Sequence, residues 1–373
     1  MFNGYLDSTA IGKPPRNQAI RAMKQLRNTV IRAGLEALYF SGAHILLRPI
    51  FSGVGAVFML HHVRPPHDGD FQPNRHLEVT PQFLRAVLTH LKSRDIDIVS
   101  MDEAHDRLRT RNFARRFACF TFDDGYRDNR DHALPVMREF AAPFTVYVTS
   151  DFAEGTGRLW WVALERTIAK ASSIEVKMGD ATARFNTKTA SAKQAAYDRL
   201  HDWLRCLPAH DIQREVSALC ERHGLDEAAI CRDLCLSWDE LKSFAADPLV
   251  EIGGHTITHC NLAQQSEEVA SEELTASRAR IEEKLQRPVL HLAYPYGDRN
   301  AAAAREFALA AATGYKTAVT TRPGMIFPDN ADHLTALPRV SLNGKYQEAR
   351  IVPVLTSGAA TAMWNGFRRV DAA

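Results

Sequence analysis

Apolar residues recur with two different periods along the chain, and the two periods alternate. Short apolar runs predict buried strands at 54–60, 96–100, 117–122, 144–148, 289–293 and 316–320. Helical spacing of apolar residues predicts helices at 81–91, 131–140 and 266–286, with an alanine-rich helix before the last strand. Thr80 and Pro81 mark a helix start, as cap and first helical residue, and Pro288 ends the third helix.

The repeated alternation of strand and helix predicts an α/β architecture: a parallel (β/α) sheet that is closed, or nearly closed, into a barrel. Residues 154–236 depart from this pattern, because helical patterns run there without a clear strand. We therefore expect a helical insertion within a barrel domain of residues 54–345. Residues 1–53 are expected to form a basic, helical N-terminal extension, and residues 346–373 a C-terminal tail.

Composition limits the class of protein and its partners. Of the 373 residues, 45% are hydrophobic and 24% are charged, which predicts a buried core rather than disorder. The formal net charge of +2 gives no indication of nucleic acid as a partner. The six cysteines form no CxxC pair and have no regular spacing, which predicts reduced thiols in a non-oxidising compartment.

The N-terminal segment does not have the pattern of a secretory signal. A polar, basic stretch from Lys13 to Arg32 precedes any apolar run, and His44 and Arg48 interrupt that run. No uninterrupted run of eighteen or more apolar residues exists, so no membrane span is predicted. Residues 31–51 either form an amphipathic helix on a membrane surface or pack against the barrel domain. The expected location is the cytoplasm, with peripheral contact at the inner face of the membrane as the alternative.

Two motifs contain the candidate chemistry. Asp123 and Asp124 end the apolar run 117–122, and adjacent carboxylates repel each other unless a cation or a proton compensates them. His255 and His259, four residues apart, would lie on one side of a helical turn and could bind one metal ion. Together these residues supply three ligands and one spare acid, as in a hydrolytic zinc site with an open coordination position. An ordinary turn and packed core histidines are the alternative.

The two motifs, in this order, resemble those of the polysaccharide deacetylase family, the NodB-homology carbohydrate esterases. The resemblance covers residues 54–345 and rests on Thr-Phe-Asp-Asp-Gly at 121–125 and His-Thr-Ile-Thr-His at 255–259. It implies a deformed (β/α) barrel and a hydrolase of carbon–nitrogen bonds other than peptide bonds. Such enzymes remove acetyl groups from N-acetylated amino sugars of a glycan or oligosaccharide, such as a chitooligosaccharide.

The resemblance also implies roles for individual residues. Asp124, His255 and His259 correspond to the family's metal ligands, and Asp123 corresponds to the general base. Zn²⁺ is the expected ion, with Co²⁺ or Ni²⁺ as alternatives. A backbone N–H near Tyr126 would help the metal to stabilise the oxyanion.

The acid for the leaving amine is expected near the first strand. No late Leu-x-His motif is present, but Phe-Met-Leu-His-His-Val at 58–63 resembles a branch of the family with the acid histidine in this place. His61 is therefore the expected acid, and histidine suits proton transfer near neutral pH. His62 is the alternative, and a purely structural role for both is the third interpretation. Asp128 and Asn129 are expected to support the loop around the metal.

A third stretch departs from the family's pattern. Leu-Ala-Tyr-Pro-Tyr-Gly at 292–297 resembles the third motif, but Ala293 stands where an arginine usually orients the base. Arg339, expected after the last strand, is the candidate replacement, and a surface salt bridge is the alternative.

Five residues are assigned to substrate contact, and the remaining single histidines, His291 among them, are assigned no role. Tyr296 is expected in the pocket wall. Trp160 and Trp161 either stack on sugar rings or anchor the insertion to the barrel. The five residues are Tyr126, Trp160, Trp161, Tyr296 and Arg339.

Three functions remain open. The leading one is a metal-dependent deacetylase acting on an N-acetylated glycan or sugar. The second is a deformylase or deacetylase of a lipid-linked sugar, held at the membrane surface by the basic N-terminal segment. The third is a catalytically silent glycan-binding module. The presence of all the expected metal ligands argues against this third function.

Overall fold

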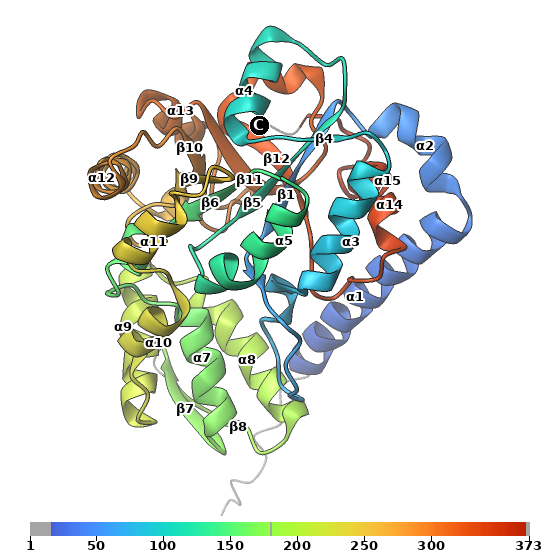
Figure 1. The fold of residues 1–373 in the computed structure, drawn as a ribbon. Helices are drawn as coiled ribbons and strands as arrows, with labels where there is room; N and C mark the ends of the chain where they lie inside the picture. Colours follow the sequence, from blue (N-terminus) through green and yellow to red (C-terminus); the bar gives the residue numbers. More distant parts are fainter. Residues whose placement is uncertain (1–15, 180, 371–373) are drawn as a thin grey trace, which may run out of the picture.

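Seven parallel strands close into a barrel in this computed structural model, which describes residues 16–179 and 181–370 (Figure 1). The strand order is β1, β12, β11, β10, β9, β6, β5, and the ring closes because β1 pairs with both β12 and β5. A short strand, β4, pairs with the first two residues of β5, Phe117 and Ala118. The bounds are β1 Gly55–Leu60, β4 Asp97–Ile98, β5 Phe117–Phe122, β6 Phe144–Val148, β9 Val250–Gly254, β10 His291–Ala293, β11 Thr317–Pro323 and β12 Leu337–Ser341.

The predicted parallel α/β barrel is confirmed, but two of its strands, β9 and β12, were not predicted. The first reads Val-Glu-Ile-Gly-Gly and the second Leu-Pro-Arg-Val-Ser, so neither is a continuous apolar run. In β9 the packing requires glycine, since a Cβ on Gly253 would lie 2.4 Å from the ring of Tyr147. Arg339 consequently lies within the last barrel strand and not after it.

Helices cover the outside of the barrel. The helix predicted at Thr80 begins there, since Thr80 Oγ1 accepts a hydrogen bond from Phe83 N at 3.1 Å. The covering helices are α3 Pro81–Lys92, α4 Met101–Thr110, α5 Leu134–Glu139 with a preceding π-helical turn η2 Asn129–Ala133, α11 Trp238–Phe244, α12 Glu267–Leu285 and α13 Ala304–Ala312. Short 3₁₀ turns are η1 Arg75–Leu77, η3 Leu262–Gln264, η4 Pro328–Asp332 and η5 Leu334–Ala336.

Side-chain alternation along the strands divides the core into two parts. Phe58 and Phe120 belong to the large cluster between the strands and the outer helices. Val57 and Cys119 belong to a separate cluster that also contains Leu337. Positions of the same parity as Cys119 and Leu337 point the same way, so Asp123 and Arg339 are both directed toward this second cluster.

An insertion lies between β6 and β9, at one end of the barrel (Figure 1). Its helices are α6 Ser150–Ala153, α7 Trp160–Lys170, α8 Ala190–Leu204, α9 Ala209–Arg222 and α10 Glu227–Leu234. The prediction of an insertion without strands was wrong, because β7 Ser173–Met178 and β8 Ala181–Asn186 form an antiparallel hairpin. In β8, Phe185 is the one large apolar residue, so no apolar alternation marks that strand in the sequence.

Two further strands and the terminal helices complete the described chain. β2 His62–Val63 pairs with β3 Glu78–Val79. The helices α1 Arg16–Phe40 and α2 Ala43–Phe51 lie beside α14 Ile351–Thr356 and α15 Ala359–Trp364, which form within the predicted tail (Figure 1). Residues 1–15 of the predicted extension lie outside the described residues. Among the described residues, no single helix has the length and apolarity needed to cross a membrane. The segments Asn28–Phe40 and Ala43–Phe51 reach that length and apolarity only when they are taken together, and the chain bends by 95° between them.

An ionic cluster around the buried His291 lies at the amino ends of the strands. His291, at the start of β10, places Nε2 3.3 Å from both Asp102 and Glu251, and Nδ1 2.8 Å from Thr317 Oγ1. Lys316 Nζ also contacts Asp102, at 2.8 Å. Burial by itself would lower the pKa of His291, but the hydrogen bonds and charges of Asp102 and Glu251 outweigh it and raise the pKa above its ordinary value.

This cluster predicts a pH-dependent contribution to stability. A histidine with a raised folded-state pKa stabilises fully below its unfolded pKa, and the contribution is lost as pH rises through the folded-state value. His291→Gln should therefore lower the free energy of unfolding by about 1.5–3 kcal/mol at about pH 6, and by less at about pH 9. Urea unfolding of both proteins at the two pH values measures the difference, and an equal loss at both would contradict the assignment.

Candidate active site

The three side chains expected to bind a metal ion converge at the carboxyl ends of two barrel strands. Asp124 follows β5, and His255 and His259 lie on the loop after β9. Asp124 Oδ1 is 3.5 Å from His255 Nε2 and 3.3 Å from His259 Nε2. One ligand atom from each of the three lies within 4.8 Å of the others, so the group could hold a metal ion. The carboxyl ends of parallel strands meet at one rim, which is why motifs so distant in sequence come together.

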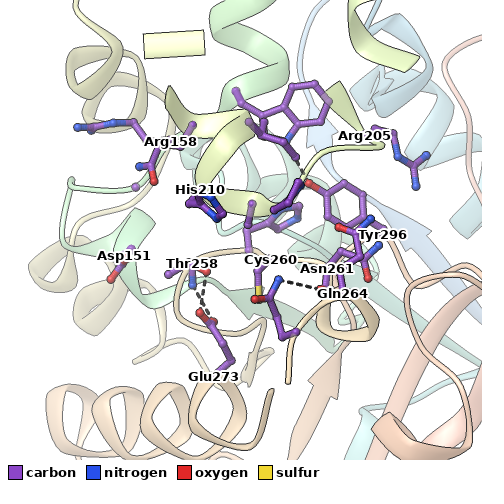
Figure 2. A pocket seen from close by; sticks show the side chains of 18 of the residues that line it. Asp151, Arg158, Arg205, His210, Thr258, Cys260, Asn261, Gln264, Glu273 and Tyr296 are labelled. Carbon is purple, nitrogen blue, oxygen red and sulfur yellow. Dashed lines mark hydrogen bonds between the residues drawn. The ribbon is translucent and has the colours of Figure 1, made fainter. Parts of the chain in front are cut away.

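The two histidines do not share a helical turn, so that expectation was wrong. The loop is irregular, with positive φ at Thr256 (65°) and His259 (62°), and it is held from outside by a buried acid. Glu273 of α12 accepts hydrogen bonds from Ile257 N at 2.8 Å and from Thr258 N and Oγ1 at 3.0 and 2.7 Å (Figure 2). Sequence reasoning missed Glu273, although an acid beside the apolar stripe of α12 was a signal that could have pointed to it.

The hydrogen bonds of His255 show why a cation fits here. Its Nδ1 lies 2.6 Å from the carbonyl of Ala293, which can only accept, so Nδ1 carries a proton, and in the neutral imidazole Nε2 is then the acceptor. Asp124 Oδ1 is buried and has no hydrogen-bond donor in suitable geometry among the described residues. Acceptors that face one another in a buried site require a proton or a metal ion between them. Two imidazoles and one carboxylate suit Zn²⁺ and other divalent transition metals.

The charges of these groups respond to the same arrangement. Burial alone would lower the pKa of His255, but Asp124 and Asp123 outweigh it, so the pKa lies above its ordinary value. Burial alone would raise the pKa of Asp124, but the neighbouring imidazoles of His255 and His259 outweigh burial and hold this pKa well below its ordinary value. Asp124 also adopts φ 74°, a left-handed conformation that is uncommon outside glycine and typical of strained functional positions.

Asp123 is held by Arg339 rather than by the ligand set. Arg339 Nη1 and Nη2 donate to the two carboxylate oxygens of Asp123, each at 2.7 Å. Nη1 also donates to Thr121 Oγ1, and Nε donates to the carbonyl of Thr320. Burial would raise the pKa of Asp123, but the guanidinium outweighs burial and holds the pKa below its ordinary value.

This contact decides between the interpretations of Arg339. Its side chain is fully buried, so the expectations of a substrate contact and of a surface salt bridge were both wrong. The family's motif has an arginine at the position of Ala293. In this protein the arginine comes instead from β12, which is the last barrel strand in the sequence but lies beside the first, β1, in the barrel.

His61 and His62 point to different surroundings. His61 Nε2 lies 3.9 Å from Asp123 Oδ2 and its side chain is 19% exposed. His62 Nδ1 contacts Asp128 Oδ2 at 2.7 Å, and its ring stacks on Tyr126 with a centroid distance of 3.6 Å. Asn129 Nδ2 donates to the carbonyl of His61 at 2.7 Å. Only His61 of the pair faces Asp123, while Asp128 and Asn129 hold this strand end in place. Burial lowers the pKa of His61.

The aromatic residues separate into buried anchors and a cavity wall. Tyr126 is completely buried against His62, so its side chain does not reach the cavity, contrary to its assignment as a substrate contact. Trp161 is buried in the core of the insertion, with its ring 5.0 Å from that of His259. Trp160 Nε1 donates to Tyr296 Oη at 3.0 Å, and these two side chains line a cavity.

That cavity, of about 350 Å³, lies beside His259 (Figure 2). The insertion contributes one wall and the barrel loops contribute the other. The labelled residues of the wall are Asp151, Arg158, Arg205, His210, Thr258, Cys260, Asn261, Gln264, Glu273 and Tyr296. The guanidinium of Arg205 lies 5.1 Å from the ring centre of Tyr296 and fixes that ring from the solvent side.

Comparisons with known proteins agree with this geometry. The family model described as polysaccharide deacetylase matches residues 110–318, more than half of the chain. Among solved structures, the Streptococcus pyogenes deacetylase PplD in complex with acetate is similar at 19% identity and a TM-score of 0.52, over 78% of this chain and 92% of that one.

A second similar structure is BA0330 of Bacillus anthracis, provisionally named a polysaccharide deacetylase. It has 18% identity and a TM-score of 0.50, over 78% of this chain and 65% of its own. Both likenesses show the fold, and comparison with curated protein sequences gives no match. The chain belongs to the polysaccharide deacetylase family.

Proposed function

We propose that this protein is a divalent-metal-dependent hydrolase that removes acetyl groups from N-acetylated amino sugars of a glycan. One observation carries the proposal: three possible ligand atoms, from Asp124, His255 and His259, lie within 4.8 Å of one another, and the neighbouring carboxylate of Asp123 is paired with an arginine. Zn²⁺ is the proposed ion, with Co²⁺ or Ni²⁺ as alternatives. A catalytically silent glycan-binding module is the weaker candidate, because it gives no reason for a histidine 3.9 Å from an arginine-paired carboxylate beside the candidate metal ligands.

The roles of the residues follow from their positions. A divalent ion held by Asp124, His255 and His259 would supply Lewis acidity and lower the pKa of a bound water. Asp123, ionised and oriented by Arg339, would accept a proton from the attacking water. His61 would protonate the departing amine, and its distance of 3.9 Å from Asp123 supports that role. Because the pKa of His61 is lowered, its imidazolium form is a stronger acid than an ordinary histidine.

Metal removal tests the proposal directly. Acetate release from N-acetylated chitooligosaccharides and peptidoglycan fragments should disappear after chelation and return with Zn²⁺, Co²⁺ or Ni²⁺. His255→Ala should bind no stoichiometric metal and release no acetate. His291→Gln is the matched control, because this buried histidine lies in the ionic cluster at the other end of the strands. Acetate release that survives complete chelation would refute metal dependence.

Replacement of His61 tests the assignment of the acid. His61→Ala should lower kcat by at least about 100-fold, since general acid catalysis contributes about 10²–10⁴-fold. The metal content should stay unchanged, because His61 is not among the three ligand residues. If kcat stayed within about tenfold of the wild type, a change of roughly 1.4 kcal/mol in the activation free energy, another group would have to be the acid.

We also propose that the protein acts in the cytoplasm, with contact at the inner face of the membrane. Support for that contact comes from the surface formed by the terminal helices.

A further inference from the structure

The terminal helices expose an unusual number of large apolar side chains. Seven of them, 49–78% exposed, lie at the end of α1, on α2, on α15 and just after α15. We call this surface the apolar face; it consists of Phe40, Ile45, Leu46, Ile50, Met363, Trp364 and Phe367. The two parts are continuous, since α2 packs against α15 and the rings of Phe51 and Phe367 are 5.7 Å apart. Single exposed apolar residues are ordinary, whereas a contiguous patch marks an interaction site.

The charge of this region indicates what covers the apolar face. Residues 37–53 and 357–370 contain no acidic residue, and they contain Arg48, Arg368 and Arg369. Residues 16–35, which lead into the face along α1, contain five basic residues and no acidic one, and Glu36 after them is paired with Arg350. Apolar side chains with a tryptophan, in a region where arginines outnumber carboxylates, have the composition of a surface that binds anionic lipid headgroups and inserts into the boundary of the acyl chains.

A second cavity connects this region with the catalytic side of the barrel. It has a volume of about 690 Å³ and lies between α1, the helices α14 and α15, the end of β12 and the insertion. Trp364 of the apolar face lines it, together with Leu35, Leu355 and Ala360. On the insertion side it is lined by His201, whose ring lies 5.1 Å from that of Trp160. Trp160 in turn lines the cavity beside His259, so one pair of rings separates the two cavities.

We propose that the apolar face docks on an anionic lipid bilayer and that the larger cavity holds the apolar chain of a lipid-linked N-acetylated sugar. The proposal rests on the proposed function, because the sugar of such a substrate would be hydrolysed at the same site. Water adds its oxygen to the acyl carbon, the carbon–nitrogen bond breaks, and the amine takes the proton, giving acetate and a lipid-linked amino sugar.

Vesicle flotation tests the docking step with the whole protein. The wild type should float with phosphatidylcholine vesicles containing phosphatidylglycerol, less well at raised ionic strength, and poorly with phosphatidylcholine alone. Ile45→Ser/Leu46→Ser should bind at least about tenfold more weakly, since it removes apolar contact with the acyl region. Val269→Ser is the matched control, because Val269 is a similarly exposed apolar residue on α12. Circular dichroism should show all three proteins equally folded.

Fluorescence and oligomeric state separate a bilayer from other occupants. Vesicles should shift the tryptophan emission of the wild type to the blue, and Trp364→Phe should lose most of that shift. The wild type should be monomeric at the concentrations used. A dimer that Ile45→Ser/Leu46→Ser dissociates, with no flotation of the wild type, would make the face an interface between two copies and overturn the proposal.

Acetate release from two substrates tests the cavity. Ala360→Trp, which fills the larger cavity, should raise KM for a lipid-linked N-acetylglucosamine at least about tenfold and leave release from a water-soluble N-acetylated oligosaccharide unchanged. Equal effects on both substrates, or none on either, would overturn the chain-binding role. If neither substrate yields acetate while flotation persists, the proposed function fails and the docking of the apolar face stands.

Discussion

Replacing Arg339 with methionine is expected to lower the free energy of unfolding by about 3–5 kcal/mol, because it leaves the buried carboxylate of Asp123 without its partner. Asp123 Oδ1 and Oδ2 each accept one hydrogen bond from this guanidinium at 2.7 Å, inside a fully buried site. The loss should be measured by urea unfolding of the metal-loaded protein. Arg85→Met is the matched control, since Arg85 donates the same two hydrogen bonds to Glu139 on the exposed surface. This substitution should leave the urea concentration at the midpoint of unfolding nearly unchanged.

The same variant should change the pH dependence of turnover. Arg339 lowers the pKa of Asp123, so its removal raises that pKa. The acid limb of the pH–rate profile should then move to higher pH, because a protonated carboxyl cannot accept the proton of water. Adding Asp123→Asn to Arg339→Met should restore part of the lost stability, as it removes the unpaired charge. A double variant no more stable than Arg339→Met would contradict the charge argument.

Asp123→Asn alone is expected to lower kcat by about 10³–10⁴-fold, near the upper end of what a general base contributes. The amide keeps the size of the carboxyl but cannot take a proton at neutral pH. Metal content should remain close to one ion per chain, because the candidate ligand set of Asp124, His255 and His259 is intact.

Metal analysis and single-turnover acetate release on the same preparation check this prediction. Asp124→Asn is the informative comparison, since it should lose metal affinity together with turnover. If Asp123→Asn also lost its metal, Asp123 would have to be counted among the ligands, and the separation of base from ligands would be wrong.

The barrel could be predicted from the sequence because most of its strands are continuous apolar runs separated by amphipathic helices. The two strands that escaped prediction contain residues that packing or the site requires. β9 contains Gly253 and Gly254, which leave room for the side chains of Tyr147 and Tyr315, and β12 contains Arg339, the partner of Asp123. Neither strand therefore has the continuous apolar run by which buried strands are identified.

The candidate ligands could be located because they belong to short local motifs. Their supports could not, because each support contacts its partner across a long stretch of chain. Glu273 lies on a helix and holds a loop by its backbone amides, and Arg339 is 216 positions from Asp123. His291 had no motif at all, and only the barrel brings it beside Asp102 and Glu251.

The position of Arg339 on the strand that closes the barrel has a consequence for how the enzyme matures. The candidate ligands come from β5 and β9, which lie earlier in the chain, whereas the partner of Asp123 arrives only when β12 joins β11 and β1. A partly folded chain could gather its ligands and still have a base whose ionisation nothing stabilises. Competence for hydrolysis is thereby tied to closure of the ring by β12.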